Sequence, residues 1–187
     1  TADIDRDFTP ANNATDVTAL LEHLSIANAA VIGHSTGAAV ALEMAINHPA
    51  SVSKAVALSG SVKAEAAIPE FADMDALLAS GRIPTAEEMI AMQQDYERLS
   101  PTPGNWEAFH QKIATSNDGS GWTDEQLAGI ACPILVVLGD LDFVQLGHLT
   151  DLQRSIAGSE VGVLPGTTHT QVPTRTDLLA PMLAAFL

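Results

Sequence analysis

A short polar segment between two apolar runs is the feature that most constrains this chain. In "AAVIGHSTGAAVALEMA", residues 29–45, the apolar residues give way to "GHSTG" and then resume. A plain loop does not need glycine at both of its ends. A sharp turn that raises one side chain between a buried strand and a closely packed helix does. The stretch therefore predicts strand, turn and helix, with Ser35 at the apex.

This segment matches the G-x-S-x-G pattern, in which a strained turn holds a serine hydroxyl above a sheet. Gly33 and Gly37 lack the Cβ atoms that we expect would collide where strand and helix pass closely. The start of the helix directs backbone N–H groups toward the same place, which suits a developing oxyanion. The pattern predicts a nucleophilic serine.

Apolar strand segments alternate with helical ones along most of the chain. The strand segments are apolar on both faces, which is typical of a parallel sheet covered by helices on both sides. The sequence therefore predicts an α/β fold. The expected strands are 28–32, 54–58, 134–138 and 160–164, and the expected helices are 13–24, 37–47, 148–156 and 176–187.

Residues 61–130 interrupt this alternation. They hold no comparable strand, but Thr85–Glu88 and Thr123–Gln126 have the pattern of helix-capping boxes. We expect a helical lid inserted into an α/β core made of residues 1–60 and 131–187. The alternative is that these helices only add packing.

Acidic and histidine side chains follow the last two expected strands. Asp140 and Asp142 come after 134–138, and His169 comes after 160–164. Carboxyl ends of parallel strands meet at one edge of a sheet, so Ser35, one of these aspartates and His169 are expected to converge there. The alternatives are that the aspartates only cap their turn and that His169 is an exposed loop residue.

These segments resemble the α/β-hydrolase superfamily, in particular its lid-bearing, esterase-like branch. The resemblance extends from about Asn13 to Leu187, with "GHSTG" as the nucleophile elbow, "GDLD" as the acid turn and "LPGTTH" as the histidine turn. It implies an α/β-hydrolase fold, a mostly parallel sheet with helices on both faces and a helical lid.

The resemblance also implies roles for single residues. Ser35 is the nucleophile, His169 the general base and acid, and Asp142 the residue that orients His169; the family's Gly-x-x-Asp pattern selects Asp142 over Asp140. Thr36 follows the nucleophile and donates a backbone N–H to the oxyanion. The remaining elbow residues are Gly33, His34 and Gly37, with His34 a neighbour of the nucleophile and not the base.

The amino-terminal part departs from the family pattern. Members of the superfamily carry several strands and a His-Gly turn before the elbow, and that turn gives a second oxyanion N–H. Only 34 residues precede Ser35, and they contain neither feature. Three explanations are open: a fragment of a longer protein, a partner chain that completes the sheet, or a trimmed form. We expect a fragment, with an exposed sheet edge at the strand that begins at Asn28.

Composition excludes several function classes. The formal net charge is −15, with 8 Lys and Arg residues against 23 Asp and Glu, which disfavours binding to nucleic acids or anionic membranes. The histidines show no ligand spacing with cysteines or carboxylates, so neither a metal nor another cofactor is expected. We expect a small ester-like substrate, a cytoplasmic location and, through the exposed edge, a homo-oligomer.

The predicted activity is that of a serine hydrolase that cleaves a carboxylic ester or a related acyl compound through an acyl-enzyme. Two alternatives are kept. The fold is a non-catalytic binding module, or the triad serves a carbon–carbon bond hydrolase, a perhydrolase or a thioesterase.

Overall fold

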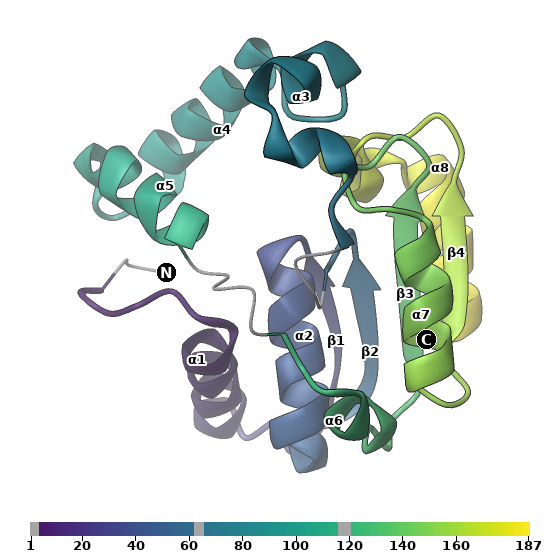
Figure 1. The fold of residues 1–187 in the computed structure, drawn as a ribbon. Helices are drawn as coiled ribbons and strands as arrows, with labels where there is room; N and C mark the ends of the chain where they lie inside the picture. Colours follow the sequence, from purple (N-terminus) through teal and green to yellow (C-terminus); the bar gives the residue numbers. More distant parts are fainter. Residues whose placement is uncertain (1–3, 62–65, 116–120) are drawn as a thin grey trace.

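A four-stranded, all-parallel sheet forms the centre of the protein. The computed structural model describes residues 4–61, 66–115 and 121–187. Neighbouring strands follow each other in chain order, β1-β2-β3-β4, so all arrowheads point to the same end in Figure 1. The strands are β1 (Ala29–His34), β2 (Val52–Leu58), β3 (Ile134–Gly139) and β4 (Glu160–Leu164).

Helices cover both faces of this sheet, as the apolar strands predict. Alternate residues of β2 belong to different cores: Ala55 and Ala57 face one core, and Val56 and Leu58 face the other. Figure 1 shows α2 and α7 in front of the sheet and α8 behind it. The helices of the front layer are α1 (Pro10–His23), α2 (Thr36–Asn47) and α7 (Gly147–Ser155), and the rear helix is α8 (Thr176–Phe186). The predicted α/β architecture is confirmed.

Helix α1 begins earlier than predicted. The sequence pattern placed its start at Asn13, but Thr9 is the N-cap and accepts a hydrogen bond from the Asn12 N–H at 3.2 Å. Pro10 occupies the first helical position, where a missing N–H costs nothing. The polar residues at this end carry no apolar period, which is why the pattern alone missed the first turn.

The segment between β2 and β3 is helical where the structure describes it. Both predicted capping boxes are present, at Thr85 with Glu88 and at Thr123 with Gln126. Helices α3, α4 and α5 lie beyond the arrowhead end of the sheet (Figure 1). The helices of this insertion are α3 (Met74–Ser80), α4 (Ala86–Leu99), α5 (Trp106–Thr115) and α6 (Asp124–Ala128), and residues 62–65 and 116–120 lie outside the described part.

Strand β1 forms one edge of the sheet. Within residues 4–28 no strand precedes it, and its only strand partner in the described part of the chain is β2. Ile32, in the middle of β1, is 48% exposed, whereas its partner on β2, Val56, is fully buried. The rear layer therefore leaves β1 uncovered. In the described residues, no helix is long and apolar enough to cross a membrane.

Association through this edge stays a prediction. Ile32→Lys is expected to lower the self-association of the chain, because a lysine on an edge strand disfavours pairing with another chain. Light scattering coupled to size-exclusion chromatography over a concentration series measures it. Val163→Lys is the control, because Val163 is exposed to a similar extent on the opposite edge strand, β4. Equal masses for all three proteins at every concentration would contradict the expectation.

Candidate active site

Ser35 lies at a strained turn between β1 and α2. Its φ of 55° and ψ of −120° are conformations that a non-glycine residue adopts only when the surroundings impose them. The close approach of strand and helix imposes this turn. A Cβ atom added to Gly33 would lie 1.8 Å from the carbonyl oxygen of Gly37. The predicted turn is present, and glycine is required at position 33.

Gly37 does not serve the purpose that the sequence analysis gave it. A Cβ atom at this position would meet no heavy atom of the described residues within 4 Å. The expectation of a collision at both glycines is therefore wrong for Gly37. The backbone of Gly37 is the group that crowds Gly33, but the Cβ position of Gly37 itself is open, so only the strand glycine is required for space.

Ser35, His169 and Asp142 form a continuous line of hydrogen-bonded side chains. The Ser35 Oγ lies 2.9 Å from the His169 Nε2, and the His169 Nδ1 lies 2.9 Å from an oxygen of Asp142. Ser35 follows β1, Asp142 follows β3 and His169 follows β4, all at the same end of the sheet. The three residues that the sequence predicted to converge do so.

The carboxylate of Asp142 sets the proton positions in this line, which is largely buried. His169 is 6% exposed and Asp142 is fully buried. A carboxylate only accepts hydrogen bonds, so the His169 Nδ1 carries a proton and donates it to Asp142. The His169 Nε2 is then the bare nitrogen that accepts from the Ser35 hydroxyl. The Oδ1 of Asp142 also accepts from the Val144 N–H at 3.0 Å, which holds the carboxylate in place.

Asp140 has a different function from Asp142. Its side chain accepts a hydrogen bond from the Thr167 N–H at 3.0 Å and a second from the backbone of Gly166. The two turns are also in direct contact, because a Cβ on Gly139 would lie 1.9 Å from the Thr167 carbonyl oxygen. Asp140 therefore ties the acid turn to the histidine turn, two residues before His169, and does not contact the imidazole.

The hydrogen bonds from Gly166 and Thr167 lower the pKa of Asp140 below its usual value. The ionised carboxylate thus stabilises the folded protein above the pKa of the unfolded chain, about 4, and this stabilisation is lost as pH falls through the lower folded pKa. Between pH 6 and pH 3, the Asp140→Asn variant is expected to lose less of its free energy of unfolding than the parent protein does. Urea unfolding of both proteins at several pH values measures it, and parallel curves would contradict it.

Two aromatic rings flank the imidazole of His169. Phe143 stacks on it with ring centroids 4.1 Å apart, and the His34 ring lies 5.0 Å away on centroids. The His34 Nε2 is 2.9 Å from the backbone carbonyl oxygen of His169, so His34 contacts the loop of His169 and not the Ser35 hydroxyl. Sequence reasoning set His34 aside as the base, which this contact agrees with, but it missed both neighbours.

The insertion touches the two loops that carry Asp142 and His169. Arg82 donates to the backbone carbonyl of Asp142 at 3.0 Å, and Thr170 donates to the Glu88 carboxylate at 2.8 Å. The same Glu88 side chain closes the capping box of α4. No local signal in the sequence connects these pairs. The α3–α4 connection and the start of α4 are thus attached beside the serine–histidine–aspartate line.

The first turn of α2 provides N–H groups beside Ser35. The N–H groups of Ala38 and Ala39 donate to the Ser35 carbonyl oxygen, so the helical hydrogen bonds begin there. The N–H groups of Thr36 and Gly37 lie before the first helical donor, at the end of the helix where N–H groups have no partner within the helix. Thr36 is thus the first residue of the helix after Ser35, and its role as an oxyanion donor stays a prediction.

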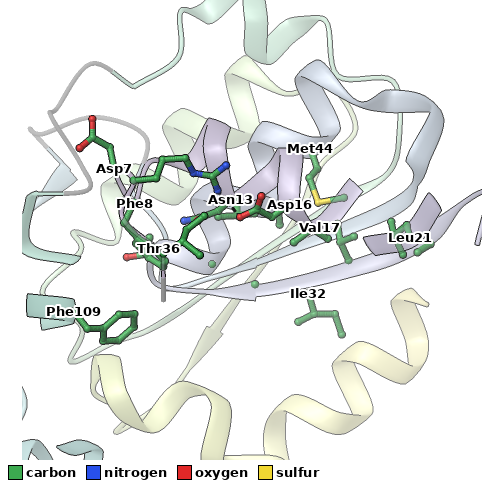
Figure 2. Close-up of a pocket in the computed structure, with 18 of the residues that line it drawn as sticks. Asp7, Phe8, Asn13, Asp16, Val17, Leu21, Ile32, Thr36, Met44 and Phe109 are labelled. Atoms are coloured by element: carbon green, nitrogen blue, oxygen red, sulfur yellow. Dashed lines mark hydrogen bonds and ion pairs between the residues drawn. The ribbon is translucent and has the colours of Figure 1, made fainter. Parts of the chain in front are cut away.

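A groove of about 900 Å³ runs along the free edge of β1. Figure 2 shows 18 of its lining residues, which come from the segment before α1, from α1, β1 and α2, and from the insertion. Leu21 lies at one end of the view, and Thr36 lies toward the other end with Asp7 and Phe109. Ser35, Asp142 and His169 do not line it. The groove therefore lies beside these three residues, with the neighbouring Thr36 in its lining. In the described residues, no group of three or more metal-ligating side chains is present.

Comparisons with known proteins agree with this fold. The sequence model of the alpha/beta hydrolase family matches residues 2–180. Among solved structures, an N-acyl homoserine lactone degrading enzyme is 22% identical, with a TM-score of 0.73. The match covers 96% of this chain and 75% of the chain of that enzyme. The enol-lactonase from Burkholderia xenovorans is 21% identical, with a TM-score of 0.69 and coverages of 96% and 73%. A structure from a study of carboxylesterases of Nitrososphaera gargenis is 23% identical, with a TM-score of 0.67 and coverages of 96% and 73%.

The family match extends over nearly the whole chain, so the chain belongs to the alpha/beta hydrolase family. The identities to solved structures are too low to carry a substrate over, but they agree on the fold. Membership of this family supports a hydrolase activity.

Proposed function

We propose that this protein is a serine hydrolase that cleaves a carboxylic ester or a related acyl compound. The observation that carries the proposal is the pair of 2.9 Å contacts, from Ser35 to His169 and from His169 to Asp142. A serine hydroxyl is a weak nucleophile on its own, and a histidine base held by a carboxylate is what activates it.

The reaction follows from the proton positions. The Ser35 Oγ attacks the acyl carbon while the His169 Nε2 takes its proton, and the buried Asp142 stabilises the resulting imidazolium. His169 then donates this proton to the leaving alcohol, and the carbon–oxygen bond breaks to leave an acyl-serine. A water molecule, deprotonated by the same nitrogen, then attacks the acyl carbon. The bond from this carbon to the Ser35 Oγ breaks, His169 returns the proton to the Oγ, and the acid is released. The strained turn keeps the Ser35 hydroxyl exposed to an incoming acyl carbon.

The oxyanion that forms during attack needs hydrogen-bond donors. We assign one to the backbone N–H of Thr36, which directly follows the nucleophile and opens α2. The helix dipole adds partial positive charge at the same position.

Two arguments support the proposed substrate class: the chemistry of ester cleavage and the similarity to solved structures. A lactone is a cyclic ester, so ester and lactone hydrolysis need the same nucleophile, base and oxyanion donor. Two of the similar solved structures are described as lactone-degrading enzymes, and a third comes from work on carboxylesterases. Helices α3 and α4, tied to the loops of Asp142 and His169, are the proposed lid over a small acyl substrate.

Active-site labelling tests this proposal. A fluorophosphonate probe is expected to attach to Ser35 of the native protein, and mass spectrometry identifies the labelled residue. Two controls are built in. Heat-denatured protein should not be labelled, and neither should Ser59, which also has a positive φ but directly follows β2. Native protein that is not labelled at Ser35 and does not hydrolyse p-nitrophenyl butyrate or a γ-lactone would reject the serine hydrolase and favour a non-catalytic module.

A further inference from the structure

We infer that His34 is a positioning residue. Its hydrogen bond to the His169 backbone holds this general base at the right distance from the nucleophile, Ser35, which is the next residue after His34. The inference rests on the proposed function, since it concerns the same reaction. His34 itself contacts no reacting atom.

The contact has one chemical form. The His34 Nε2 lies 2.9 Å from the backbone carbonyl oxygen of His169. A carbonyl oxygen only accepts, so the Nε2 must carry the proton and donate. Burial lowers the pKa of His34, so the ring is neutral near pH 7 and its Nδ1 is bare. The tautomer is thereby fixed as Nε2–H.

The acceptor belongs to the first residue of a short 3₁₀-helix, His169–Thr174. A carbonyl oxygen has two lone pairs, so it can accept from the His34 imidazole as well as within this turn. The bond from His34 is therefore made to the start of the segment that carries the general base.

The position of His34 gives the bond its importance. Ser35 follows β1 and His169 follows β4, the two opposite edges of the sheet. Small displacements of the four strands would accumulate between these two side chains. His34 is the residue next to Ser35, and its bond reaches directly to the backbone of His169, 135 residues away in sequence. It therefore fixes the Ser35–His169 distance independently of β2 and β3.

Two amide variants separate this role from a general structural one. The Nε2 of glutamine can occupy the place of the His34 Nε2, whereas the amide of asparagine is one methylene shorter and corresponds to the Nδ1 instead. His34→Gln is expected to retain kcat within about threefold of the parent, and His34→Asn to lose about ten- to a hundredfold with little change in KM. The rate of fluorophosphonate labelling should fall in the same order. Both side chains are polar and of similar size, and melting temperatures check that both variants are folded.

Equal kcat and labelling rates for the two variants would overturn the inference while leaving the proposed hydrolase intact. A second measurement does not depend on activity. Long-range ¹H–¹⁵N NMR spectra of ¹⁵N-histidine-labelled protein should show the ring of His34 as the neutral Nε2–H tautomer, and an Nδ1–H tautomer would also overturn the inference. A parent protein without labelling or turnover would instead reject the proposed function, and the NMR result would then decide the contact alone.

Discussion

Replacing Asp142 by asparagine is expected to lower kcat by about 10⁴-fold. The carboxylate accepts from the His169 Nδ1 at 2.9 Å and so keeps the Nε2 free to take the serine proton. An asparagine amide can donate to the Nδ1 instead, which moves the imidazole proton to the Nε2 and abolishes the base. It also removes the charge that stabilises the imidazolium. Hydrolysis of p-nitrophenyl butyrate measures the loss, and circular dichroism checks the fold.

Asp140→Asn is the matched control for this variant. It removes a neighbouring carboxylate of the same turn, but an asparagine oxygen can still accept from the Thr167 N–H. We expect kcat within about tenfold of the parent, because Asp140 affects the position of His169 only indirectly, through the backbone of the histidine turn. Similar losses in both variants, or a larger loss in Asp140→Asn, would contradict the assignment of Asp142 as the partner of His169.

The fold could be predicted because its signals are local. Each strand is a short apolar run with polar or glycine residues after it, and the helices between them carry their own caps, as Thr85 and Thr123 do. The two errors have different causes. The start of α1 was missed because the Thr9 cap comes before the first apolar residue of the helical period, and the collision at Gly37 was wrong because the direction of its Cβ depends on how α2 lies against β1.

The three main site residues were predictable for the same reason, because each follows the carboxyl end of a parallel strand. Their supporting contacts were not. His34 reaches residue 169 across 135 positions, and Glu88 reaches Thr170 across 82. Arg82, which the sequence alone suggests is a solvated surface residue, reaches the carbonyl of Asp142 across 60. Such pairs leave no periodic pattern in the sequence, since either partner alone is an ordinary polar surface residue.

These contacts connect the insertion to the chemistry. Arg82 holds the backbone of Asp142, Glu88 holds Thr170, and Thr170 is the neighbour of His169. A displacement of α3 or α4 would therefore pull on the acid turn or on the histidine turn. If the insertion acts as the proposed lid, its position and the geometry of the triad residues are not independent.

Gly33→Ala is expected to have the largest effect on stability of any single methyl addition in the elbow. The new Cβ would lie 1.8 Å from the Gly37 carbonyl oxygen and 2.7 Å from the Ala38 nitrogen. Both are backbone atoms, so no side-chain rotation relieves the overlap, and β1 and α2 must move apart. Overpacking in protein cores costs about 1–3 kcal/mol and occasionally more, and with two backbone atoms in the way the loss here should lie at the upper end, a large part of the usual ~5–15 kcal/mol of stability. Urea unfolding followed by circular dichroism measures the loss.

Gly37→Ala separates this effect from a general intolerance of the elbow to extra atoms. Its Cβ would meet nothing within 4 Å in the described residues, and alanine favours helix over glycine by about 1 kcal/mol. The variant should be as stable as the parent or slightly more so. Fluorophosphonate labelling should persist in Gly37→Ala and fall in any folded fraction of Gly33→Ala, because separation of β1 from α2 would relax the turn that presents Ser35. Equal stability of the two variants would mean that the strand–helix distance does not hold the serine in its strained conformation.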